Sequence, residues 1–199
     1  MKRGIDFGTP IAIAASIAWP AVAFAHAEHG QATGLLAGLW HPVSGLDHVL
    51  AMVAVGLWGA QLGRPAIWLL PIAFPLMMAI GGVLGSTGMG LPAVEIAIAI
   101  SALVLGALIM FEGQPALPIA LGIVGFFAVF HGHAHGTELP ADASAMTYSL
   151  GFVMATGFLH AIGIAIGVTY RSPRSRQALR GAGAFVALGG LFFLVRALT

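Results

Sequence analysis

The sequence predicts an all-α membrane protein, a polytopic helical bundle with six transmembrane helices after a cleavable N-terminal signal peptide. Of its 199 residues, 59% are hydrophobic and 8% are charged, and the mean hydropathy is +0.97. The apolar residues form continuous runs of about 20, the length that an α-helix needs to cross ~30 Å of hydrocarbon. A transmembrane β-barrel would show short strands of alternating polarity instead.

Residues 1–25 are predicted to be the signal peptide. Two basic residues, Lys2 and Arg3, precede an apolar stretch that ends in Ala-Phe-Ala at Ala25, a typical cleavage pattern. An uncleaved first helix is the alternative. Cleavage would leave residues 26–199 as a single six-helix transmembrane domain.

The rest of the chain divides into six apolar segments joined by short loops, with no room for a soluble domain. The predicted spans cover residues 43–61, 65–84, 92–111, 115–135, 144–168 and 179–198. We expect Pro42 in the first turn of the first span, where proline is favoured. A short apolar segment, 34–40, precedes this span and is too short to cross the membrane.

Many of the 28 glycines are spaced four residues apart. Such spacing lets transmembrane helices approach closely, so most of these glycines are predicted to lie at helix contacts. The pairs are Gly34/Gly38, Gly59/Gly63, Gly81/Gly85 and Gly163/Gly167.

Basic residues predict the orientation in a bacterial inner membrane. The loops after the first, third and fifth spans contain Arg64, Arg171, Arg174, Arg176 and Arg180. The opposite loops contain no Lys or Arg, although Arg196 lies near the C-terminus. Because positive loops stay in the cytoplasm, the mature N-terminus is expected outside and the Arg-rich loop 171–180 inside.

Composition also excludes several classes of function. The net charge of +1 gives no support for nucleic-acid binding, and the absence of cysteine excludes thiolate metal sites. No nucleotide-binding loop of the form G-x-x-x-x-G-K-[ST] is present, so the chain is not expected to hydrolyse ATP.

Two clusters of metal-binding residue types interrupt the apolar sequence. They are His41, Asp47 and His48 in HPVSGLDH, and His131, His133, His135 and Glu138 in FHGHAHGTE. Imidazoles and carboxylates are costly in a bilayer unless they face a cavity, a partner or an ion. In the predicted topology both clusters lie at the outer side, and they suit divalent Ni²⁺, Co²⁺, Zn²⁺ or Mn²⁺. A solvated histidine-rich loop and a structural Asp47–His48 pair are the simpler alternatives.

Helical periodicity ranks the residues of these clusters. His131 and His135 share a helix face that Glu138 continues, whereas His133 points roughly opposite. Asp47 and His48 are about 100° apart on a helix, so both are not expected to bind one ion. One is expected to bind the ion, and the other to orient the side chain that binds it.

Four further residues are candidates with weaker support. Glu95, early in the third span, is costly unless it faces the interior, so it is assigned to the ion path. His160 lies deep in the fifth span. It is either a residue of the ion path or, equally, a buried histidine that hydrogen-bonds a neighbouring helix. His26 and His29 would begin the mature chain as outer metal-capturing residues, or as a solvated tail.

The sequence resembles the HupE/UreJ family of nickel and cobalt permeases. HPVSGLDHVLAM, FHGHAHGTE and ATGFLHAIGIAIG carry the resemblance, which extends over the whole chain. It places the family motifs at His41, Asp47 and His48 and at His131, His135 and Glu138. It also implies roles for Glu95 and Phe74 and makes His133 a variable position.

The resemblance implies inward transport of Ni²⁺ or Co²⁺ by a secondary permease without ATP hydrolysis, and not an enzyme. The metal is then the transported substrate, and no prosthetic group is expected. The expected partners are the metal ion and lipid, and a homo-oligomer is left open. A membrane-embedded metalloenzyme that retains its metal at the His/Asp/Glu site is the alternative, although no HExxH motif supports it.

Overall fold

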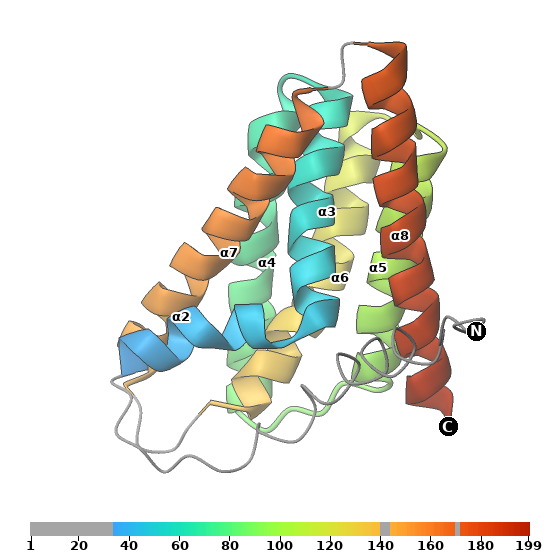
Figure 1. Cartoon of the computed structure of the whole chain (residues 1–199). Coiled ribbons are helices and arrows are strands. Elements are labelled where there is room, and N and C mark those ends of the chain that lie inside the picture. The colour runs from blue at the N-terminus through green and yellow to red at the C-terminus, as the bar shows by residue number, and fades with distance from the viewer. Residues whose placement is uncertain (1–33, 140–143, 170–171) are drawn as a thin grey trace, which may run out of the picture. The chain divides into compact units, whose positions relative to one another are not determined.

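The computed structural model describes residues 34–139, 144–169 and 172–199, and these residues form seven helices (Figure 1). The helices are α2 (Gly34–Ser44), α3 (Leu46–Leu62), α4 (Ala66–Ser86), α5 (Val94–Met110), α6 (Leu117–Thr137), α7 (Ala145–Gly167) and α8 (Pro173–Leu198). The predicted signal peptide and its cleavage site lie outside the described residues. The all-α prediction is confirmed for the described part of the chain.

The central helix of the bundle is α3, which is apolar around most of its circumference and buried along most of its length. Its buried residues include Met52, Val55 and Trp58, none of which is exposed to solvent. The most extensive helix pairs are α4 with α6, α5 with α8, and α7 with both α3 and α2. The shorter α2 lies across one end of the bundle, as Figure 1 shows.

Four of the described helices are long and apolar enough to cross a membrane, namely α4, α6, α7 and α8. A fifth candidate is the pair α2 and α3, which are apolar and long enough only when taken together and which meet at a bend of 83°. The remaining helix, α5, has 17 residues and is therefore about 25 Å long, slightly less than a ~30 Å hydrocarbon core. A multi-span helical membrane protein is thus confirmed, and the count of six spans stays a prediction.

The start of the first span was predicted wrongly. Pro42 lies inside α2, and the chain turns at Gly45, so the long helix begins at Leu46 instead of residue 43. The backbone of Gly45 is extended, which ends one helix and caps the next. A side chain there would approach the Asp47 carboxylate to 2.9 Å, so glycine suits this turn. Hydrophobicity alone does not distinguish this bend from a continuous helix.

The predicted Arg-rich loop 171–180 is also wrong in part, because α8 already begins at Pro173. Ser172 and Ser175 form a capping box there, which satisfies backbone groups of the first turn. Arg176 pairs with Glu112, and the Arg180 Nε donates to the Met110 carbonyl at 3.1 Å. These contacts hold the start of α8 against the end of α5.

Glycines bring the helices into backbone contact, as their spacing predicts. A Cβ atom on Gly81 would lie 2.0 Å from the Val129 carbonyl oxygen, and one on Gly163 would lie 2.1 Å from that of Val53. The close α4–α6 and α3–α7 pairs therefore depend on these residues. Gly63 is the exception, since it ends α3 with a positive φ of 77° and a Cβ atom there would meet nothing within 4 Å.

Gly132→Ala tests the α4–α6 contact, with Gly122→Ala on the same helix as its matched control. A Cβ at Gly132 would lie 1.9 Å from the Met78 carbonyl oxygen, whereas one at Gly122 meets nothing within 4 Å. Gly132→Ala should cost about 1–3 kcal/mol by overpacking, and Gly122→Ala should be neutral or slightly stabilising. The measurement is thermal unfolding of the purified variants in detergent. Equal melting temperatures for the two variants would contradict this packing.

Candidate metal centre

The two histidine and carboxylate clusters meet at one end of the bundle. His41 lies near the end of α2, and Glu138 lies just beyond the end of α6. The His41 Nε2 donates to the Glu138 Oε2 at 3.0 Å. The Nδ1 of His135 lies 3.9 Å from the same carboxylate oxygen. One ligand atom from each of these three residues lies within 4.8 Å of the others. Residues 97 positions apart in sequence therefore form one group that is able to hold a metal ion.

Asp47 holds the imidazole of His48. The Asp47 Oδ1 accepts hydrogen bonds from the backbone N–H of His48 at 2.9 Å and from its Nδ1 at 3.1 Å. Because Nδ1 carries the proton, the lone pair of His48 lies on Nε2. That nitrogen is buried without a hydrogen-bond partner in the described part of the chain. A carboxylate that fixes the tautomer of a metal-binding histidine is a common arrangement. The sequence left open which of the two residues would bind the ion, and this hydrogen bond suits Asp47 to the orienting role.

His131 is the innermost histidine of the cluster and is completely buried. The hydroxyl of Ser101 on α5 donates to the Ile98 carbonyl at 2.6 Å, so its oxygen accepts from the His131 Nε2 at 2.9 Å. The Nδ1 of His131 is thereby left with its lone pair. The His48 ring lies 4.8 Å from the His131 ring and 4.3 Å from the His135 ring, measured between centroids. The imidazoles thus form a continuous group from the surface inward.

His133 lies apart from this group. Its Nε2 donates to the Met89 carbonyl at 2.7 Å, in the segment between α4 and α5. This contact agrees with the helix-face argument, which directs His133 away from His131 and His135. His133 therefore links the end of α6 to a neighbouring loop.

Exposure and charge change along the site. The side chain of Glu138 is 59% exposed and that of His41 is 30% exposed, whereas His131 is fully buried. The hydrogen bond from His41 is the largest influence on Glu138 and lowers the pKa of its carboxyl, against the opposing effect of partial burial. Glu138 is therefore an anion at neutral pH, and its negative charge attracts cations to the open end of the site.

Comparison with known proteins identifies the family of the chain. The family described as "HupE / UreJ protein" matches residues 13–193. The chain belongs to the HupE/UreJ family. It is 48% identical over 181 residues to the protein HupE of Rhizobium leguminosarum bv. viciae, which covers 91% of this chain and 94% of that protein. No solved structure matches the chain.

The candidate ligand set of this HupE/UreJ member consists of imidazole nitrogens and carboxylate oxygens. These atoms suit first-row divalent ions such as Ni²⁺, Co²⁺ and Zn²⁺, and the general affinity order alone does not select among them. Bonds of about 2 Å require ligands on opposite sides of an ion to be about 4 Å apart. The observed separation of up to 4.8 Å needs only small side-chain rotations to reach this value.

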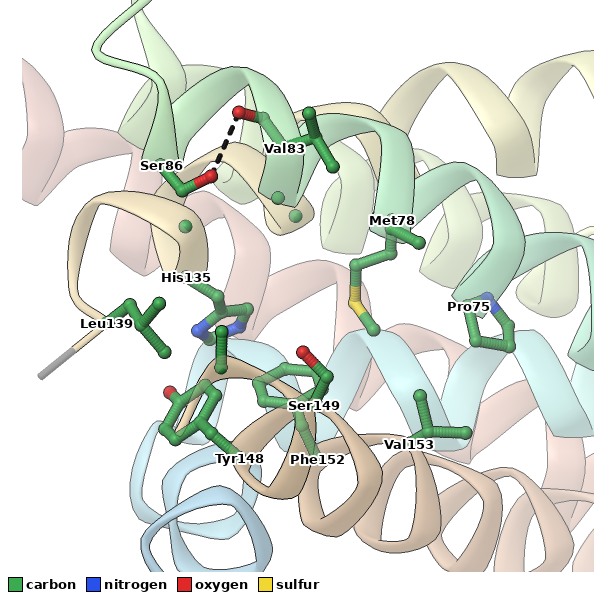
Figure 2. A pocket seen from close by; sticks show the side chains of 15 residues that line it. Pro75, Met78, Val83, Ser86, His135, Leu139, Tyr148, Ser149, Phe152 and Val153 are labelled. Atoms are coloured by element: carbon green, nitrogen blue, oxygen red, sulfur yellow. Dashed lines mark hydrogen bonds between the residues drawn. The ribbon is translucent and has the colours of Figure 1, made fainter. Parts of the chain in front are cut away.

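A pocket of about 270 Å³ opens beside the cluster, between α4, α6 and α7 (Figure 2). His135 is one of its lining residues and lies close to Tyr148 and Phe152. Both nitrogens of the His135 ring are buried without a hydrogen-bond partner among the described residues. The other lining groups are mostly apolar. A hydrated divalent ion is costly in such surroundings, so the polar mouth at His41 and Glu138 is the better approach for metal.

The other sequence candidates lie at varied distances from the cluster. Glu95 is exposed in the first turn of α5, outside the group of ligand atoms, although its charge interacts with those of Asp47 and Glu138. Phe74 and His160 are buried. The Phe74 ring lies between the rings of His131 and His160 in a chain of ring contacts. His26 and His29 lie outside the described residues.

Three residues of the site were absent from the sequence interpretation. Ser101 fixes the tautomer of His131, and its signal in the sequence is that it carries the single hydroxyl of α5. Phe152 packs against the His135 ring at 4.3 Å between centroids, and Tyr148 lies 5.9 Å from the His41 ring. Aromatic residues in a transmembrane segment are too common for their sequence alone to indicate this role.

His135→Ala and His133→Ala separate the two faces of α6. We expect His135→Ala to weaken Ni²⁺ binding about 100-fold because it removes a ligand, and His133→Ala to weaken it less than about 10-fold. Titration calorimetry of the purified variants in nanodiscs measures both constants. Equal losses in the two variants would contradict the assigned helix face.

Proposed function

We propose that this chain is a secondary permease that carries Ni²⁺ or Co²⁺ into the cell. The observation that carries the proposal is the convergence of His41, His135 and Glu138, in a multi-span member of the HupE/UreJ family. The family membership supports the same assignment, because the sequence resemblance to the HupE/UreJ family implies transport of nickel or cobalt. A protein with an ion path needs polar ligands inside an apolar bundle, and this cluster provides them.

The proposed topology has six spans after a signal peptide that ends at Ala25. The two short candidates, α5 and the broken α2–α3 pair, are then spans as well. The metal cluster lies at the start of α3 and the end of α6, whereas Arg64 and Arg180 lie at the opposite ends of the helices. With arginines in the cytoplasm, the cluster faces outward and takes metal from outside.

The membrane potential is the proposed driving force. It contributes about 2.3 kcal/mol per charge per 100 mV, and hence roughly 4.6 kcal/mol for a divalent cation moving inward. The histidines must be unprotonated to bind metal, so proton release accompanies capture of the ion. Neutral imidazoles with one or two carboxylates favour binding that is reversible enough for release on the inner side.

Asp47→Asn tests the function directly. The change preserves size but removes the charge that fixes the His48 tautomer, so uptake should fall at least about 10-fold while the protein stays in the membrane. The measurement is uptake of radioactive ⁶³Ni²⁺ and ⁵⁷Co²⁺ by cells that express the wild type or the variant, with each metal competing against the other. The preferred metal is the one that inhibits uptake of the other at the lower concentration.

Glu112→Gln is the matched control, since it makes the same chemical change at the opposite end of the bundle. It should leave uptake within about twofold of the wild type. Normal uptake by membrane-localised Asp47→Asn would contradict the proposed site. Absence of uptake by the wild type would contradict transport itself and favour a metalloenzyme.

A further inference from the structure

His160 on α7 is buried without a visible structural purpose. His160 is 1% exposed, and neither nitrogen of its ring has a hydrogen-bond partner in the described part of the chain. Buried polar groups nearly always have partners, because an unpaired one costs about 1–3 kcal/mol.

Two oxygen atoms are candidate neighbours of this imidazole, one by its spacing on α7 and one by its interaction with the ring. Thr156 precedes His160 by one helical turn, so the two side chains share a face of α7. Thr156 is fully buried, and its hydroxyl also has no partner among the described residues. The other oxygen is the Pro71 carbonyl of α4, which interacts with the His160 ring although no hydrogen bond of normal geometry joins them.

The Pro71 carbonyl is available because of a second proline. In an α-helix this oxygen would accept from the N–H four residues later, and that residue is Pro75, which has no N–H. The sequence of α4 therefore frees a backbone oxygen inside the bundle. Freed carbonyls in broken or distorted transmembrane helices are a known means of coordinating cations.

Phe74 separates this second group from the outer cluster. Its ring centroid lies 5.5 Å from that of His131 and 5.6 Å from that of His160. Phe74 is 1% exposed and lies on α4 between the two prolines, where the helix lacks part of its hydrogen-bond ladder. The ring thus forms an apolar barrier between the outer cluster and His160, on a segment that bends more easily than a regular helix.

We propose that His160, the Thr156 hydroxyl and the Pro71 carbonyl form an inner binding station for a divalent first-row metal ion, which the ion reaches when Phe74 moves aside. The proposal rests on the transport function proposed above. The inner station has no carboxylate, so it holds the ion more weakly than the outer site and favours onward release. Two divalent ions this close repel each other, so the stations are occupied in turn.

The absence of cysteine from the chain allows a direct test. His160→Cys introduces a single thiol, whose thiolate gives a charge-transfer absorption in the near ultraviolet when it binds Co²⁺. The full-length variant, purified in nanodiscs, is titrated with Co²⁺ and its spectrum recorded. The expected result is a charge-transfer band that grows with bound Co²⁺ and disappears with a chelator.

His133→Cys is the matched control, because His133 is also buried and already bonded to Met89. It should give no band. Thr156→Cys provides a second probe of the station, in case His160→Cys fails to fold, and it should also give the band. Co²⁺ binding without a band in both station variants would overturn the proposal, as would an equal band in His133→Cys.

Uptake kinetics distinguish a station from a merely structural histidine. His160→Gln should lower the maximal rate of ⁶³Ni²⁺ uptake at least tenfold and leave the half-saturating concentration within twofold, since the outer site is intact. An unchanged maximal rate would also overturn the proposal. Failure of the wild type to take up metal would instead remove the transport function, while the Co²⁺ band would still report on the station.

Discussion

The bend at Gly45 is the constraint on which the candidate metal centre depends. Because α2 and α3 meet there at 83°, His41 and His48 approach the end of α6 from two directions. A straight helix would place these residues seven positions apart on one face, about 10 Å along the axis. The bend instead lets His41 reach Glu138 while His48 lies beside His135. Gly45 thus allows residues of one short sequence motif to contribute to the candidate site from two helices.

The hydrogen bonds around the cluster prepare its histidines as ligands. Asp47 and Ser101 each accept a hydrogen bond from one imidazole N–H, which leaves the other nitrogen of His48 and of His131 with a lone pair inside the bundle. An ion bound at the proposed site would offset the cost of burying these nitrogens without hydrogen-bond partners. The glycine contacts between α4 and α6 hold the backbone that carries His131 and His135. Packing and site chemistry therefore depend on the same helix pair.

Local sequence was sufficient for the features that depend on helical period and composition. The positions of the long helices, the opposite direction of His133 and the pairing of Asp47 with His48 follow from spacing and chemistry within a few residues. The bend at Gly45, the early start of α8 and the exposed position of Glu95 do not, because each depends on contacts with other helices or on the end of its own helix. The stack of His131, Phe74 and His160 joins three helices, and no spacing within one segment indicates it.

A double-mutant cycle on Ni²⁺ affinity tests most directly whether the two sequence clusters form one site. The pair is His41→Ala on α2 and His135→Ala on α6, measured singly and together by calorimetry in nanodiscs. If both residues bind the same ion, each single change removes most of the affinity and the double change adds little, giving a coupling energy above about 1 kcal/mol. Independent, additive losses would show two separate sites and contradict the shared metal centre.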